Sequence, residues 1–377
     1  GVRIMAYTTI DDPSAHFQSL RWSGNGGGQR DLTFGGNSDM QPDATMWFKE
    51  NGVQLRLLTD SSRSWESGNH ELALDSAIQE GDTNAVNTGQ YGWLAGNSSV
   101  TNGLRAYIGG YANSSNINYY AASWKVNGGT TASNTDGSIT STVQNNSDAG
   151  FSIITYAGTG SNGTIGHGLG VTPKFLFFKD RTSTGWWATW HEAIGDDNKL
   201  ALNNYGIKDA DGAFMNSTLP TSSVITIGGA SVHTNANNRN YVCYAFTDVQ
   251  GYSKYGSYKG NGNANGPFIY TGFKPRAIFT KKIDGPVGSW VWHDSRMGQS
   301  TGSGTSSGTD INPATANQVI ESNSNSMDDY GDIDFLSNGF KIRDTDTRVN
   351  ENNTTFIYMA WADSPFTTST GTPTTAR

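Results

Sequence analysis

The chain has 377 residues, a length that suits two or three domains better than one. Charged residues make up 15% of it and aromatic residues 11%, which is more aromatic area than a disordered polar chain carries. The net charge of −8 and the lack of a basic stripe argue against nucleic acid as a partner. The sequence has no long apolar run, which argues against membrane insertion. A single cysteine excludes an intrachain disulfide framework.

Short runs of β-branched and aromatic residues predict strands along the whole chain, because each run is bounded by Gly, Asn or Pro. Examples are FSIITYAG (151–158), KFLFFKD (174–180), NYVCYAF (240–246), RAIFTKK (276–282) and TFIYMAWA (355–362). The many Gly and Asn residues disfavour helices. We therefore predict an all-β protein of short antiparallel strands, in which Cys243 is a buried structural thiol.

An internal repeat organises the chain. Tyr156-x-Gly158-x-Gly160 matches Tyr258-x-Gly260-x-Gly262. The later landmarks keep the same spacing: a proline thirteen residues after the second glycine, a lysine six residues after the proline and a Trp-His pair seventeen residues after it. They are Pro173, Lys179, Trp190 and His191 in one copy, and Pro275, Lys281, Trp292 and His293 in the other.

A divergent third copy comes first in the chain. FQSLRWSGNGG (17–27) matches the opening, MQPDATMWFKENG (40–52) matches the Pro-to-Lys strand with one extra residue, and LTDSSR (58–63) replaces the Trp-His segment. We expect three tandem antiparallel β-sandwich units of jelly-roll or concanavalin-like type. They span 1–149, with an N-terminal arm, 150–252, and 253–377, with a Gly/Ser-rich loop (298–318) and a polar tail (367–377) that is free or ordered by a partner.

The pairs His191-Glu192 and His293-Asp294 have the residue types of general acid–base catalysis. Neighbouring residues on a strand point to opposite faces, however, so a histidine and the next residue do not converge on one substrate atom. The pairs also fall at one repeated position. We therefore expect a structural role for them and no enzymatic activity.

Two acidic stretches are the candidates for calcium. KDADGAF (208–214) lacks the bidentate glutamate that completes a calcium loop, and MDDYGDIDF (327–335) is either a calcium site or a solvated acidic turn. The candidate ligands are Asp209, Asp211, Asp328 and Asp329. Beyond this calcium the sequence predicts no metal and no cofactor.

Aromatic residues among Gly, Ser and Asn are the candidates for binding carbohydrate, because such rings stack on sugars while amides bond hydroxyl groups. The two stretches are GGYANSSNINYY (109–120) and TGWWATW (184–190). The candidate residues are Tyr111, Tyr119, Trp186 and Trp187. The alternative is that these rings belong to the core.

Several of these stretches resemble repeat-built, tail-fibre-like structural proteins of marine tailed bacteriophages. They are AYTTIDDPSAHFQSLRWSGNGG (6–27), MQPDATMWFKENG (40–52), GVTPKFLFFKD (170–180), FKPRAIFTKK (273–282), FLSNGFKIRD (335–344) and FIYMAWADSPFTTSTGTPTTAR (356–377). The resemblance covers nearly the whole chain and implies lectin-like β-sandwich repeats without catalytic residues. The first unit departs from the pattern by lacking the aromatic pair after its lysine strand.

The resemblance implies a virion protein that is assembled in the host cytoplasm and works outside the cell. We expect it to be tail- or fibre-associated and to display lectin-like surfaces to a host glycan. Its partners would be other virion proteins and further copies of itself, with a trimer favoured. The alternatives are a capsid decoration or cementing protein and, third, a polysaccharide depolymerase.

Overall fold

The computed structural model describes residues 8–49, 56–63, 70–81, 94–95, 99–106, 112–295, 317–320 and 332–374. It is nearly all-β, with 43% strand and 4% helix, so the predicted fold class is confirmed at this level. The helical segments are the short turns η1 (Pro13–Ala15), η2 (Ser61–Arg63), η4 (Glu192–Ile194) and α1 (Thr347–Asn350). None of the described helices is long and apolar enough to cross a membrane.

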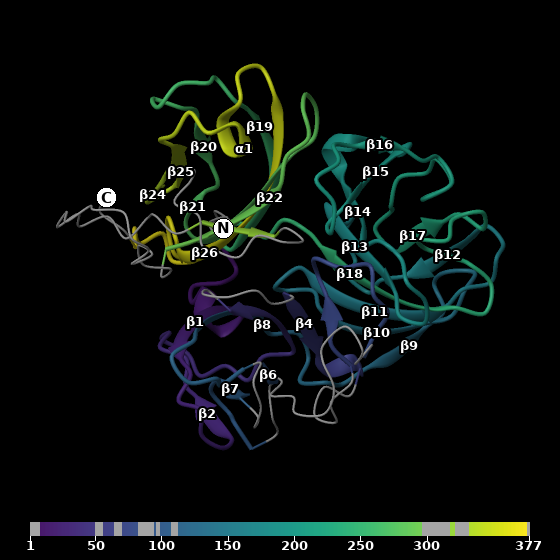
Figure 1. Cartoon of the computed structure of the whole chain (residues 1–377), viewed down its shortest axis with the longest axis horizontal. Helices are drawn as coiled ribbons and strands as arrows, with labels where there is room; N and C mark the ends of the chain where they lie inside the picture. Colours follow the sequence, from purple (N-terminus) through teal and green to yellow (C-terminus); the bar gives the residue numbers. More distant parts are fainter. Residues whose placement is uncertain are drawn as a thin grey trace, which may run out of the picture.

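Three lobes surround a common centre, and each contains one large antiparallel sheet (Figure 1). The first lobe has the order β1 (Phe17–Ser23), β8 (Asn118–Trp124), β3 (Ala44–Lys49), β4 (Leu57–Asp60) and β5 (Leu72–Ala73). The second has β11 (Phe151–Ala157), β18 (Asn240–Phe246), β13 (Phe175–Asp180), β14 (Ala188–His191) and β15 (Asn198–Ala201). The third has β19 (Ser253–Lys259), β26 (Thr355–Pro365), β21 (Phe273–Lys282), β22 (Trp290–Asp294) and β23 (Asn317–Ile320). β1, β11 and β19 therefore pair with the last strand of their lobes, and that last strand also pairs with the strand that follows or contains the repeated proline.

A small sheet lies in each lobe as well, and its strands also correspond. They are β2 (Arg30–Leu32), β7 (Leu104–Ala106) and β6 (Leu94–Ala95) in the first lobe, β12 (Gly163–Gly166) and β17 (Val224–Ile227) in the second, and β20 (Phe268–Tyr270), β25 (Gly339–Ile342) and β24 (Ile333–Leu336) in the third. Apolar residues of each small sheet share a core with one face of the large sheet. In the third lobe, for example, Ile269 and Phe340 join a cluster with Ile278 and Tyr358.

The large sheets are buried on both faces, which explains their almost continuous apolar strands. One face meets the small sheet of its own lobe, and the other meets a core shared by all three lobes. At the centre Trp124, Phe246 and Trp361 lie at the same position of the last strand in their lobes. Their ring centroids are 6.5 Å apart for Trp124–Phe246, 5.3 Å for Trp124–Trp361 and 6.1 Å for Phe246–Trp361. The three lobes therefore close into a ring around one aromatic cluster.

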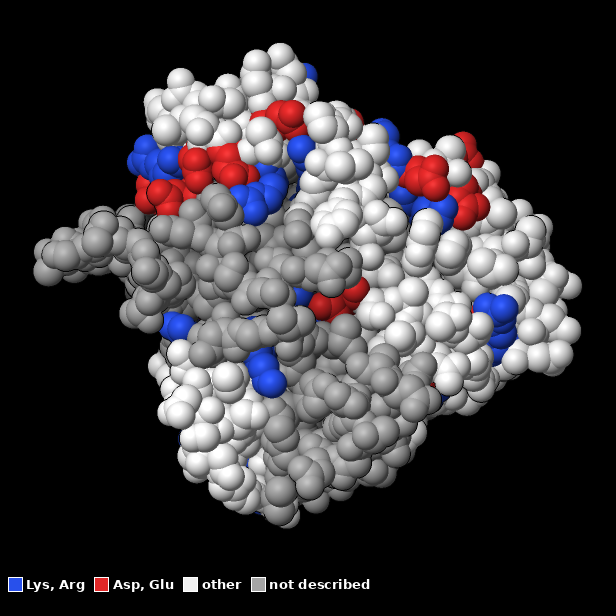
Figure 2. Space-filling view, viewed as in Figure 1, with Lys and Arg blue, Asp and Glu red and all other residues white. Residues whose placement is uncertain are grey.

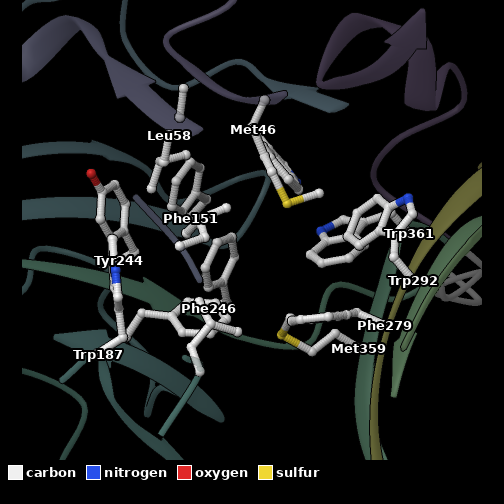
Figure 3. Close-up of a pocket in the computed structure, with 15 residues that line it drawn as sticks. Met46, Leu58, Phe151, Trp187, Tyr244, Phe246, Phe279, Trp292, Met359 and Trp361 are labelled. Carbon is white, nitrogen blue, oxygen red and sulfur yellow. The ribbon is translucent and has the colours of Figure 1, made fainter. Parts of the chain in front are cut away.

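A small cavity of about 50 Å³ lies within this shared core. It is lined by residues from every lobe, among them Met46, Phe246 and Trp361, whose side chains converge in Figure 3. The lining exposes no polar atom. An apolar cavity of this kind stays dry, so its cost is the lost packing contacts of the rings around it.

One turn recurs at the end of the first strand in all three lobes. An aromatic residue is followed by a glycine two positions on and by a second glycine with positive φ four positions on. The sets are Trp22, Gly24 and Gly26 (66°), Tyr156, Gly158 and Gly160 (71°), and Tyr258, Gly260 and Gly262 (63°). A Cβ at the first glycine would lie 2.0, 2.2 or 2.3 Å from a backbone carbonyl oxygen, so only glycine fits there.

A buried asparagine closes each of these turns, eleven residues before the central aromatic residue. Asn113, Asn235 and Asn350 each accept the N–H of the second glycine on the backbone oxygen. Each also accepts the preceding N–H on the side-chain oxygen, at 3.2, 2.8 and 2.9 Å. The sequence comparison found the glycines in all three units but gave no role to these asparagines.

Part of the stretch before residue 150, which the sequence assigns to the first unit, pairs with the second sheet. Strands β9 (Ala132–Asn134) and β10 (Ser141–Asn146) extend that sheet, because β10 pairs with β11. Just before them, the N–H groups of Val126 and Gly128 donate to Asp43 of the first lobe. The described part of the tail is also held within the chain: Ser369 donates from both its N–H and its hydroxyl to Asp11. Most of the predicted loop 298–318 lies outside the described residues.

Candidate functional site

The two Trp-His segments do not occupy the same place in the fold. The residue two positions after the proline pairs with His191 in the second lobe, where it is Phe175, but with Asp294 in the third, where it is Ala277. The hairpin between β21 and β22 is one residue longer than that between β13 and β14. Residues that the gap-free sequence match aligns after this hairpin are therefore one position apart in the fold. The true counterparts are Asp60, His191 and Asp294.

His191 is built into the backbone of its own lobe. Its ring is fully buried, and Nδ1 accepts the N–H of Ala193, which caps the turn η4. Burial lowers the pKa of His191 to about 3, and the nearby Lys174 adds to this effect. The neighbouring carboxylate, Glu192, points to the other side and forms an ion pair with Lys174. A neutral, capped and buried imidazole cannot exchange protons with a substrate at neutral pH.

The buried neutral state of His191 predicts acid sensitivity. The unfolded state binds a proton below the ordinary histidine pKa, whereas the folded state binds it only near pH 3, so folding stability falls as the pH drops through this window. Between pH 7 and pH 5 His191 contributes a loss of about 2 kcal/mol. Urea unfolding of a His191→Asn variant, which keeps a capping side chain, should show this much less pH dependence than wild type. An unchanged pH slope would contradict the assignment.

Asp294 and its counterpart Asp60 instead join neighbouring lobes. Asp294 accepts the hydroxyl of Tyr120 from the first lobe at 2.7 Å and lies 3.1 Å from Nε of Arg276. Asp60 accepts the hydroxyl of Tyr244 from the second lobe at 2.5 Å. Both tyrosines are fully buried, and burial, together with the carboxylate, raises the pKa of each hydroxyl well above its ordinary value. These carboxylates are held as interface acceptors.

The repeated lysine also has an interface role. Nζ of Lys179 donates to the carbonyl oxygen of Ala77 in the first lobe at 3.1 Å, and Nζ of Lys281 donates to that of Tyr205 in the second lobe at 3.0 Å. Each ammonium also donates to a glycine carbonyl of its own hairpin. Burial lowers the pKa of Lys179 to about 8. The lysine thus clamps the second lobe onto the first and the third onto the second.

A tryptophan works beside each lysine. The indole N–H of Trp187 donates to Ala73 in the first lobe at 2.7 Å, and that of Trp290 donates to Ala201 in the second lobe at 3.0 Å. Ala73 and Ala201 lie at corresponding positions of β5 and β15. The repeated Pro-to-Lys segment and its tryptophan are therefore the docking surface between lobes.

Two of the four predicted carbohydrate-binding residues are buried rather than exposed. Trp187 is fully buried in the clamp just described. Tyr119 is fully buried as well: its ring stacks on Trp22, and its hydroxyl accepts the N–H of Ser114. Contacts with segments distant in sequence bury these rings: Trp187 donates to Ala73 of the first lobe, and Tyr119 stacks on Trp22 of β1. Tyr111 lies outside the described residues.

Trp186 is the predicted residue that reaches the surface, with 43% of its area exposed. It lies in the hairpin between β13 and β14, and its ring stacks on His233 with centroids 5.9 Å apart and planes inclined by 11°. Burial lowers the pKa of His233, and Lys199 lowers it further. The result is a neutral two-ring platform with Lys199 and Asp211 nearby, which we call the Trp186 platform.

The two described calcium candidates, Asp209 and Asp211, both form ion pairs with Lys199. Each carboxylate lies 3.1 Å from Nζ of Lys199, whose single positive charge offsets one of the two negative charges. The described residues contain no group of three His, Cys, Asp or Glu side chains that could hold a metal. Asp328 and Asp329 lie outside the described residues. In Figure 2 several described acidic and basic residues on the face shown gather in small mixed groups, while a few basic residues stand alone.

Comparison with known proteins places this architecture in a family. A domain described as a domain of unknown function, DUF7483, matches residues 12–365. The chain belongs to the DUF7483 family. No curated protein and no solved structure matches it.

The DUF7483 match runs through all three lobes as one domain. This agrees with the shared core and the interlobe clamps, through which each lobe packs against the other two. The sequence analysis assigned no role to Arg276, Tyr120 or Tyr244, which hold Asp294 and Asp60 at the lobe junctions. The sequence feature that could have indicated these residues is a charged or hydroxyl-bearing side chain inside or beside an apolar strand.

Proposed function

We propose that this protein is a non-enzymatic structural protein of a bacteriophage particle, tail- or fibre-associated, which displays lectin-like surfaces to a host glycan. The observation that carries the proposal is the ring of three lobes closed on Trp124, Phe246 and Trp361. In this ring the repeated polar residues connect the lobes. The resemblance to repeat-built virion proteins supplies the biological setting.

The proposal includes an origin by duplication into three tandem β-sandwich units. It is supported by the common strand order of the large sheets and by the recurring turn closed by Asn113, Asn235 and Asn350. A homo-oligomer, with a trimer as the first candidate, remains part of the proposal. Light scattering after size-exclusion chromatography tests it, and a monomer at micromolar concentration would contradict it.

The state of the acid–base candidates supports a non-enzymatic role. His191 is neutral and capped, and Asp294 is held by Tyr120 and Arg276. A polysaccharide depolymerase is therefore the less favoured alternative. Release of reducing ends from a polysaccharide, lost on Glu192→Gln or Asp294→Asn substitution in a folded variant, would establish it instead.

The Trp186 platform is the proposed carbohydrate contact. Replacing Trp186 with alanine should lower the affinity for a bound glycan about tenfold, since the stacking area is lost, while unfolding stability changes by less than about 0.5 kcal/mol. Leu219→Ala is the matched control, because Leu219 is 51% exposed in the same lobe and carries no ring. Glycan-array binding of both variants is the measurement, and equal binding by Trp186→Ala and wild type would reject the platform.

The place on the particle is tested separately. Gold-labelled antibody against the protein, applied to intact phage particles, should mark the tail or its fibres. Label over the capsid would favour the decoration or cementing protein instead. Particles that carry no label and no copy of the protein by mass spectrometry would overturn the proposal.

A further inference from the structure

A surface groove of about 480 Å³ is lined by the third lobe and the segment that leads into it, and it shares no residue with the Trp186 platform in the second lobe. Its walls come from three separate parts of the chain: the segment that joins the second and third lobes, the turn after β20, and the residues that follow β26. A volume of this size falls in the range of small-molecule sites.

Two exposed aromatic rings belong to this groove. Tyr270 is 62% exposed and Phe366 is 38% exposed. On β20 the neighbouring outward residue, Phe268, is 46% exposed, and it shares the outer face of the small sheet with Tyr270 because the two are separated by one residue. The third lobe thus presents three exposed rings in and beside the groove. Scattered single apolar residues need no explanation, but a cluster beside a groove marks a binding surface.

The backbone beneath the rings is fixed. The N–H of Phe366 donates to the carbonyl of Gly272, and its own carbonyl accepts the N–H of Thr374. Tyr270 lies at the end of β20, and the next residue, Thr271, donates its hydroxyl to the carbonyl of Phe273 at 2.7 Å. A ligand that stacks on these rings would therefore lose little affinity to ordering the backbone.

The polar wall of the groove is neutral overall. The carboxylate of Asp248 forms an ion pair with Lys254 at 2.7 Å and accepts the N–H of Tyr255 at 2.8 Å. Gln250 is exposed, and its backbone oxygen accepts the hydroxyl of Thr8 at 2.8 Å. The groove thus offers a carboxylate, an amide and an ammonium beside aromatic faces, with no net charge that would favour an acidic or a basic ligand.

From this combination we infer that the groove bounded by Tyr270, Phe366 and the Asp248–Lys254 pair is a binding site for a neutral oligosaccharide. The apolar face of a sugar ring stacks on the aromatic rings, and its hydroxyl groups exchange hydrogen bonds with the polar wall. The inference rests on the proposed function only in taking a glycan as the ligand, and it assigns that ligand to a different lobe.

The test is an array of neutral hexose and N-acetylhexosamine oligomers together with sulfated and sialylated glycans. The full chain should bind at least one neutral oligomer. Tyr270→Ala and Phe366→Ala should each weaken this binding about tenfold or more, whereas Tyr270→Phe, which keeps the ring, should retain most of it. Tyr205→Ala is the matched control, because Tyr205 is 40% exposed in another lobe. Thermal unfolding of each variant verifies that it is folded.

Three results would overturn the inference: no neutral glycan bound by wild type, binding confined to acidic glycans, or binding that survives both alanine substitutions. Loss of binding in Trp186→Ala with full binding in the two groove variants would reject the groove and keep the platform. Labelling of particles is independent of either outcome, so failure of the groove and failure of the virion role can be told apart.

Discussion

Replacing Trp361 with alanine is expected to destabilise the protein by about 3–5 kcal/mol, the usual cost of emptying a large aromatic site in a core. Trp361 is 2% exposed and contacts rings of all three lobes, including Phe17, Phe246 and Trp292. It also borders the central cavity, which the substitution would enlarge. Because Trp361 packs against residues of all three lobes, we expect the three lobes to unfold together in a single transition at a lower denaturant concentration than in wild type.

The measurement is equilibrium unfolding in urea, followed by far-UV circular dichroism and by tryptophan fluorescence. Trp186→Ala is the control, because it removes the same side chain from an exposed position and should change stability by less than about 0.5 kcal/mol. If Trp361→Ala lowered the stability of one lobe alone, seen as two separate transitions, the shared core would not couple the lobes as the structure indicates.

Arg63→Met is expected to cost about 3–5 kcal/mol, since it leaves a buried carboxylate without its cation. The Arg63 side chain is fully buried, with Nε 2.6 Å from Asp60 and a further ion pair to Glu80. Burial opposes the charge of Arg63, but Asp60, Tyr244 and Glu80 more than offset it and hold the guanidinium pKa above its ordinary value. Asp60 also accepts the hydroxyl of Tyr244, so the substitution weakens the junction of the first and second lobes.

A matched control lies in the same lobe. Arg105 pairs with Asp31 at 2.7 Å, but Asp31 is about half exposed, so Arg105→Met should cost no more than about 1 kcal/mol. The double variant Arg63→Met, Asp60→Asn should recover part of the loss, because it removes the stranded charge. Urea unfolding of wild type and the three variants measures these differences, and equal costs for Arg63→Met and Arg105→Met would contradict the larger contribution assigned to the buried Arg63–Asp60 pair.

Much of the architecture could be predicted from local pattern. The β-branched and aromatic runs became strands, Cys243 is buried as expected, and Trp190 and Trp292 of the repeated Trp-His pairs are core residues. The repeated spacing of glycine, proline and lysine correctly predicted which strands correspond between the lobes. These features are encoded locally, in the preference of a strand for branched side chains and of a positive-φ turn for glycine.

The candidate site was predicted less well. Trp186 and Trp187 are neighbours in sequence, yet Trp186 is exposed and Trp187 lies in a lobe junction, where its indole N–H donates to Ala73 of the first lobe. The acidic candidates Asp209 and Asp211 were recognised by type, but the sequence does not reveal that Lys199 lies between them. The groove at Tyr270 and Phe366 combines segments nearly a hundred residues apart.

The sequence by itself determined the fold class, the repeat and the turns, since hydrophobic alternation and glycine placement act over a few residues. Only the tertiary structure decided how the copies meet. In the fold, His191 corresponds to Asp60 and Asp294 and not to His293, because one extra residue in a hairpin shifts the pairing of the following strand. Strand pairing, rather than sequence spacing, fixes which face a side chain occupies. The tertiary structure also turned the repeated lysine and tryptophan into interlobe clamps, since their partners are backbone carbonyls that no sequence pattern marks.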